Sequence, residues 1–154
     1  MYQHILVPLD GSELAECVMP HVEAVATGCH VSRITLIRVV LPLKLTGGLE
    51  SRITPEERHR LEQDSMSVAA DYLEAKARPL RDKGALVDCT VLFGNVVEQL
   101  VEYVREHGVD LVVIATHGRS GVSRLFLGSI AERILRSAPS PVLMVRAPGL
   151  DVQD

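Results

Sequence analysis

The stretch DLVVIATHGRSGVSRLFLGSI, residues 110–130, is the most informative part of the 154-residue chain. It opens on the apolar run LVVI at residues 111–114, whose length and β-branched content are typical of a strand buried on both faces. Gly118 and Gly121 follow this run, and Gly128 precedes a helical pattern at residues 130–137. A strand, a loop with glycines and a helix start form the arrangement by which α/β proteins hold phosphate groups.

Such a loop suits an anion for two physical reasons. Glycine lets the backbone come close to the anion and adopt positive φ. The free N–H groups and the dipole at a helix start favour negative charge. Glycine spacing alone is a weak signal, however, so a tight crossover turn without a ligand is the alternative at this point.

Apolar runs and amphipathic spacing continue this pattern over the rest of the chain. Further strands are predicted at residues 4–9, 33–40, 86–92 and 142–145, and helices at residues 13–27, 55–83 and 96–107. Within the first helix, Pro20 should introduce a kink, and Gly28 should end it. For the long second helix, the predicted inner face consists of Leu61, Val68, Tyr72, Ala75 and Pro79.

The alternation of strands and helices predicts a parallel sheet that carries helices on both faces, joined by right-handed crossovers. Ligands of such sheets bind beyond the carboxyl ends of the strands, where the strand order reverses. Asp10 follows the first predicted strand, and the glycine loop follows the fourth. If these two strands are neighbours, Asp10 and the loop face one crevice.

The composition narrows the class of protein. The chain is 47% hydrophobic and 23% charged with a net charge of −4, which suits one aliphatic core but not nucleic-acid binding, for which clustered cations are needed. Three cysteines without CxxC spacing indicate reduced thiols and a cytoplasmic location. No apolar run has the length of a membrane span. We therefore expect one domain over residues 1–147 and a flexible tail at residues 148–154.

Two segments, HILVPLDGSELAE at residues 4–16 and IATHGRSGVSRLFLGSIAERILRSAPSPVLMVR at residues 114–146, resemble the universal stress protein family. The likeness extends over about residues 2–146. Nucleotide-binding members of this family carry Gly, two residues, Gly, nine residues, Gly and a small hydroxyl residue. Ala115, Gly118, Gly128 and Ser129 keep that spacing here, with alanine in place of the first glycine.

The resemblance implies a single-domain, three-layer α/β sandwich of the Rossmann-like, adenine nucleotide alpha hydrolase-like type. Its five-stranded parallel sheet would have the order 3-2-1-4-5, with two helices on each face. It also implies a bound adenine nucleotide, namely ATP, or else AMP or ADP, with Mg²⁺ accompanying the triphosphate. The implied nucleotide contacts are Pro8, Leu9, Asp10, Val39, Ile114, Ala115, His117, Gly118, Arg119, Gly121, Gly128, Ser129 and Ile130.

Within that set the resemblance assigns roles. Asp10 would accept hydrogen bonds from the ribose hydroxyls, Val39 would lie against adenine, and the glycines with Ser129 and the Ile130 amide would hold the phosphates. Asp10 has an alternative role as a turn or cap residue, His117 as a hydrogen-bonding spacer, and Arg119 as an exposed charge.

No GxxxxGK[ST] lysine, water-positioning glutamine or general base is evident, so a regulatory nucleotide-binding protein is favoured over a kinase or ATPase. Hydrolysis of ATP would be slow at most. The alternative is a dimeric interaction module of the stress response whose pocket is empty. In either case the apolar last strand, an expected sheet edge, predicts a homodimer through Val142, Leu143, Met144 and Val145.

Overall fold

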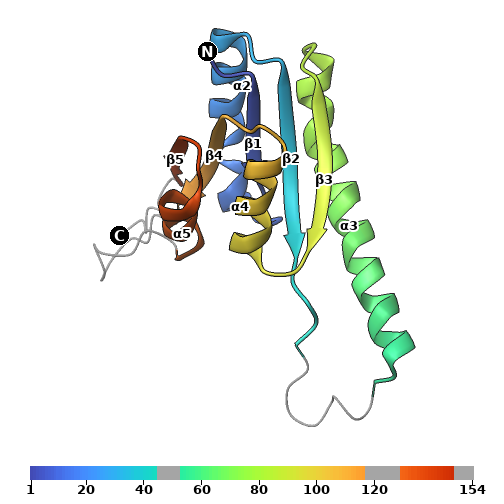
Figure 1. Cartoon of the computed structure of the whole chain (residues 1–154). Helices are drawn as coiled ribbons and strands as arrows, with labels where there is room; N and C mark the ends of the chain where they lie inside the picture. The colour runs from blue at the N-terminus through green and yellow to red at the C-terminus, as the bar shows by residue number, and fades with distance from the viewer. Residues whose placement is uncertain (45–52, 117–128, 148–154) are drawn as a thin grey trace, which may run out of the picture.

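The structure, a computed structural model, describes residues 1–44, 53–116 and 129–147 (Figure 1). The predicted tail at residues 148–154 lies outside these ranges. In chain order the elements are β1 (His4–Pro8), α1 (Glu13–Glu16), α2 (Met19–Cys29), β2 (Arg33–Val40), α3 (Pro55–Asp82), β3 (Val87–Phe93), α4 (Val96–Glu106), β4 (Leu111–Thr116), α5 (Ser129–Ser137) and β5 (Val142–Arg146).

The five strands form one parallel sheet in the order β3-β2-β1-β4-β5, which confirms the predicted fold and strand order. β1 is central and pairs with β2 on one side and β4 on the other. All five carboxyl ends therefore lie along one edge of the sheet, the lower edge in Figure 1.

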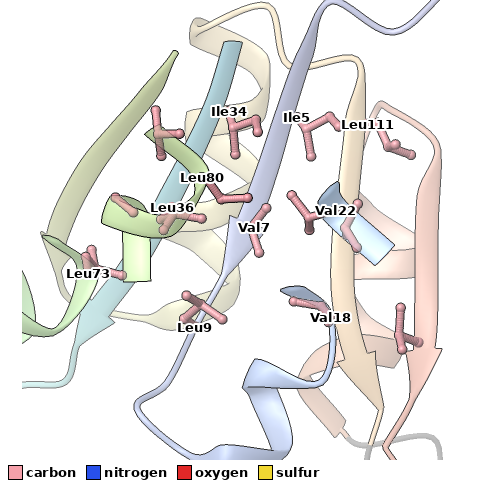
Figure 2. Close-up of a cluster of buried hydrophobic side chains, with 14 residues drawn as sticks. Ile5, Val7, Leu9, Val18, Val22, Ile34, Leu36, Leu73, Leu80 and Leu111 are labelled. Atoms are coloured by element: carbon pink, nitrogen blue, oxygen red, sulfur yellow. The ribbon is translucent and has the colours of Figure 1, made fainter. Parts of the chain in front are cut away.

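Two clusters of buried aliphatic side chains cover the two faces of the sheet. The first packs the strands against α2 and α3 and includes Ile5, Val7, Leu9, Val18, Val22, Ile34, Leu36, Leu73 and Leu80 (Figure 2). The second packs the strands against α4 and α5 and includes Leu6, Ile37, Leu100, Val101, Val112, Ile114 and Ile134. Successive residues of a strand alternate between the clusters because side chains of a β-strand point to opposite faces. The prediction of two helices on each face is thus confirmed.

The predicted helix at residues 13–27 is wrong as one element. Ser12 caps the short helix α1, and a new helix, α2, starts at Met19. Pro20 lies in the first turn of α2, where its missing N–H is no loss, so the chain breaks before the proline instead of kinking at it. α2 also runs past Gly28 to Cys29, and His30 ends it in the left-handed conformation with φ 53°.

The predicted inner face of the long helix is wrong except at Tyr72, which is partly buried against the core. α3 buries Ala69, Leu73, Ala77 and Leu80, whereas Leu61 is 45% exposed. The N-terminal half of α3 runs beyond the sheet, so the sheet does not select a buried face there (Figure 1). A capping box between Thr54 and Glu57 satisfies the free N–H groups at its start.

His4 is buried at the amino end of the sheet, with 6% of its surface exposed. Its Nδ1 lies 3.1 Å from the carbonyl oxygen of His107, and its Nε2 lies 2.8 Å from the Thr35 hydroxyl. Since a carbonyl only accepts, Nδ1 carries the proton and Nε2 accepts from Thr35. Both ring nitrogens are satisfied in the neutral form, and burial lowers the pKa of His4 below its ordinary value of 6.5.

We expect the free energy of unfolding to decrease as the pH falls through the ordinary value of 6.5, because the unfolded chain then binds a proton that folded His4 does not. The loss is about 1.4 kcal/mol for each pH unit between the two pKa values. Urea unfolding at about pH 7.5 and about pH 5.5 would measure it, on either side of the histidine range. His4→Gln retains a donor and an acceptor but does not titrate, so its stability should change less; equal changes in both proteins would contradict the assignment.

Candidate functional site

The paired edges of β1 and β4, which we call the β1–β4 seam, are closed at one end and open at the other. At the amino end, the Asp110 carboxylate accepts from the backbone N–H groups of Gln3 and His4, at 2.8 and 3.2 Å. Of the described strand residues, only Ile5 pairs with Leu111 and Leu6 with Val112. β1 continues to Pro8 and β4 to Thr116, so the strands separate towards their carboxyl ends, where the strand order reverses and α/β sheets bind ligands.

Residues 10–12, the Asp10 turn, leave β1 at this open end. The N–H of Leu9 still donates to the carbonyl of Ile37 at 2.9 Å, so the chain follows β2 up to the turn. Asp10 Oδ1 then accepts from the backbone N–H of Ser12 at 2.9 Å and from its hydroxyl at 2.6 Å. Ser12 in turn accepts from the N–H of Ala15 and caps α1. Because α1 contacts β4, the turn carries the chain from β1 towards β4.

The turn role considered for Asp10 is therefore confirmed, and it uses only one carboxylate oxygen. In the described part of the chain, Oδ2 of Asp10 has no hydrogen-bond partner, and the residue is exposed. The second oxygen is thus available to accept hydrogen bonds from a ligand.

The other predicted contact residues differ in their exposure to solvent. Leu9 and Ile114 are buried in the two cores, so a ligand could meet only their backbone. Pro8, Val39 and Ala115 are half-buried. Ile130, in the first turn of α5, is 43% exposed.

Most of the predicted phosphate-binding loop lies outside the residues that the structure describes. His117, Gly118, Arg119, Gly121 and Gly128 lie outside the described residues. The strand and the helix predicted on the two sides of the loop are present: β4 ends at Thr116, two residues beyond the predicted strand, and α5 starts at Ser129, one residue before the predicted helix.

A charged cluster beside the Asp10 turn was missed by the sequence reasoning. Arg38 of β2 lies over the ring of Tyr72 of α3, with its guanidinium carbon 5.4 Å from the ring centroid. The Tyr72 hydroxyl donates to Glu16 of α1 at 3.0 Å, and the Lys76 ammonium pairs with the same carboxylate at 2.6 Å. The cluster joins α1, β2 and α3 at the carboxyl end of the sheet.

The electrostatics of the cluster follow from its partial burial. Burial raises the pKa of Tyr72 well above its ordinary value of 10, and the hydrogen bond to Glu16 raises it further. Tyr72 therefore remains a neutral donor at every physiological pH. The one available sequence signal was Arg38, a charged residue that interrupts the apolar end of β2 and points to the opposite face of the sheet from its neighbour Ile37.

An open hollow elsewhere on the molecule contains none of the predicted contacts. It lies between α4 and α5 and is lined by Val97, Glu98, Val101, Glu102, Arg105, Glu106, Arg133 and Ser137. No helix of the described ranges is both long and apolar enough to cross a membrane. The same ranges contain no group of three or more side chains of the metal-binding types.

Comparisons with known proteins agree with this architecture. The model of the universal stress protein family matches residues 1–146. The chain is 27% identical to universal stress protein MJ0577 of Methanocaldococcus jannaschii, over 95% of this chain and 96% of that protein. It is 32% identical to universal stress protein G of Escherichia coli O157:H7, over 95% of this chain and 100% of that protein.

Solved structures share the fold. The MJ0577 structure matches with a TM-score of 0.79 at 28% identity, covering 96% of this chain and 98% of that one. A universal stress protein family member of Arabidopsis thaliana with AMP bound has a TM-score of 0.66 at 14% identity, covering 95% and 92%. A universal stress protein in complex with cAMP has a TM-score of 0.61 at 20% identity, covering 96% and 98%. The family match over nearly the whole length, together with the parallel sheet opened at the β1–β4 seam, establishes that the chain belongs to the universal stress protein family.

Proposed function

We propose that the chain binds an adenine nucleotide, ATP in the first place, between the carboxyl ends of β1 and β4 and acts as a regulatory protein of the stress response. The observation that carries the proposal is the open end of the β1–β4 seam, where Asp10 follows β1 and where β4 ends before the segment that leads to α5. Structural neighbours with AMP and cAMP support the same ligand class. The three free cysteines of the chain favour a location in the reducing cytoplasm.

In the proposed complex, residues at different strand ends contact different parts of the nucleotide. Oδ2 of Asp10 accepts from the ribose hydroxyls, and the half-buried side chain of Val39 lies against adenine. The first turn of α5, with the backbone of Ser129 and Ile130, attracts the phosphates because a helix start carries free N–H groups and partial positive charge. Gly118 and Gly128 complete the phosphate contacts from the loop.

Regulation is proposed over phosphoryl transfer because the chain supplies few of the groups that transfer needs. The sequence lacks the lysine of GxxxxGK[ST], and in residues 1–44, 53–116 and 129–147 no cluster of acidic, histidine or cysteine side chains could hold a metal. Mg²⁺ would therefore be bound chiefly through the triphosphate oxygens that accompany it into the site. Any hydrolysis of ATP would then be slow.

Binding of ATP should raise the melting temperature of the protein. A ligand that binds only the folded state stabilises it by about 2.7 kcal/mol at a hundredfold excess over Kd. For a domain of this size each kcal/mol adds roughly 2–4 °C, so a shift of several degrees in a thermal-unfolding assay is expected. If millimolar ATP, ADP and AMP all leave the melting temperature unchanged, the family module with an empty pocket becomes the better description.

Asp10→Asn tests the ribose contact without disturbing the turn. Asparagine keeps the oxygen that accepts from Ser12 but replaces the second oxygen by an NH₂ group, which cannot accept. Loss of a charged hydrogen bond should weaken ATP binding by about 1.5–3 kcal/mol, measured as Kd by titration calorimetry. Asp64→Asn, a matched change at an exposed position of α3, should leave the Kd unchanged. An unaltered Kd in Asp10→Asn would rule out the ribose role.

We also propose a homodimer formed along β5. This strand is at the edge of the sheet, and of Val142, Leu143, Met144 and Val145 only Val145 is fully buried. Ile130 and Leu135 of α5, which contacts β5, are also exposed. An apolar edge strand with free backbone groups invites pairing, and a second copy supplies it by symmetry.

Light scattering should give a mass of about twice the 16.8 kDa of the monomer. Met144→Lys should reduce that mass towards the monomer, because a charge at the paired edge has to be desolvated. Asp64→Lys introduces the same side chain on α3, away from β5, and should leave the mass unchanged. A wild-type protein that remains monomeric at micromolar concentration would exclude this interface.

A further inference from the structure

We infer that Arg38 is a positioning residue that holds the Asp10 turn in the geometry needed to bind the ribose hydroxyls. This inference rests on the proposed nucleotide function and adds a residue to its site. It is carried by the contact between the Arg38 guanidinium and Gly11, and by the ties that connect both sides of the turn to α3.

The guanidinium of Arg38 lies directly against the backbone of the turn. A Cβ built on Gly11 would be 3.0 Å from Nη1 of Arg38 and 3.2 Å from its Cζ. Gly11 also has φ +88°, a conformation that other residues rarely adopt. Glycine at this position therefore does two things: it permits the turn, and it leaves room for the arginine to contact it.

Tyr72 fixes the other side of the guanidinium. Its ring lies beneath Arg38, and its hydroxyl donates to Glu16, which is held by Lys76 as well. Glu16 belongs to α1, the helix into which the Asp10 turn leads. The turn is thus connected to α3 through the contact of Arg38 with Gly11, and the helix that follows the turn is connected to α3 through Glu16.

The charges favour the same role. In the described part of the chain, Arg38 has no carboxylate within ion-pair distance, whereas the neighbouring Lys76 is paired with Glu16. The charge of Asp10 raises the pKa of Tyr72 and that of Arg38 lowers it, so both groups lie near the Tyr72 hydroxyl. The guanidinium lies against Gly11, the residue that follows Asp10, so this contact restricts the backbone that carries the Asp10 carboxylate.

A purely structural role for Arg38 makes a different prediction. If Arg38 only covers Tyr72, its loss lowers the stability of the fold and weakens the binding of all nucleotides alike. If Arg38 positions Asp10, its loss weakens the binding only of ligands whose ribose hydroxyls Asp10 can bind. The ratio of the Kd of 2′,3′-dideoxy-ATP to that of ATP separates the two roles.

We expect this ratio to be about tenfold in the wild type, the value of one good hydrogen bond to a charged group. Arg38→Met keeps the length and the apolar stem of the side chain but removes the guanidinium, and should reduce the ratio to roughly two- to threefold or less. Arg38→Lys retains the charge without the planar group and should restore part of the ratio. Calorimetric titration of both nucleotides gives each value.

Arg33→Met is the matched control. Arg33 is in the same strand but at its amino end, where it pairs with Asp88 of β3. Its replacement should lower the unfolding midpoint and leave the ratio at the wild-type value. Arg38→Gln provides a second variant in case Arg38→Met does not fold, and the unfolding midpoint without nucleotide verifies each protein.

The outcomes distinguish this inference from the function on which it rests. A wild-type ratio that persists in Arg38→Met and Arg38→Gln overturns the role of Arg38 and leaves nucleotide binding intact. Equal binding of ATP and 2′,3′-dideoxy-ATP by the wild type overturns it as well, because Asp10 then does not bind the ribose. If neither nucleotide binds the wild type, the proposed function fails, and the role of Arg38 fails with it.

Discussion

The structure depends on the parallel pairing of β1 with β4, where the order of the strands reverses. At its amino end this seam is held by main-chain pairing and by Asp110, whose carboxylate accepts from two consecutive N–H groups and whose own N–H donates to the His4 carbonyl at 3.1 Å. No such ties are present between the described residues of the two strands beyond Leu6 and Val112. The central strands can therefore separate at their carboxyl ends without weakening the rest of the sheet.

The two ends of the sheet consequently differ in chemistry. At the amino end, His4 is buried, neutral and fully hydrogen-bonded between Thr35 and His107. At the carboxyl end, charged groups gather instead: Asp10 is exposed, and Arg38 and Lys76 surround the ring of Tyr72. The aliphatic cores on both faces keep these ends apart, since burial of apolar surface supplies most of the stability and leaves polar groups to the edges. The buried, neutral His4 and the proposed ligand-binding groups thus lie at opposite ends of one sheet.

The fold could be predicted from the sequence because the pattern of strands and helices and the family resemblance both extend over nearly the whole chain. It predicted all five strands, their order and a last helix at residues 130–137, one residue later than α5 starts. It failed in two places. The buried face of α3 depends on how far the helix runs beyond the sheet, and Pro20 lies in the first turn of a new helix instead of kinking a continuous one. The cluster of Glu16, Arg38 and Tyr72 was not predictable, since its members come from three elements with no common spacing.

Asp10 illustrates why a site residue and a turn residue need not be alternatives. A carboxylate has two oxygens, and here Oδ1 serves Ser12, whose hydroxyl in turn accepts from Ala15 at 3.1 Å and starts α1. This use of one oxygen restricts the rotation of the side chain and so fixes where the other oxygen points. The side chain of Asp10 has therefore lost its rotational freedom already on folding. A ligand that binds Oδ2 does not have to immobilise it, which lowers the entropic cost of binding. The local role of Asp10 in the turn is therefore a physical reason to expect a second, ligand-binding role.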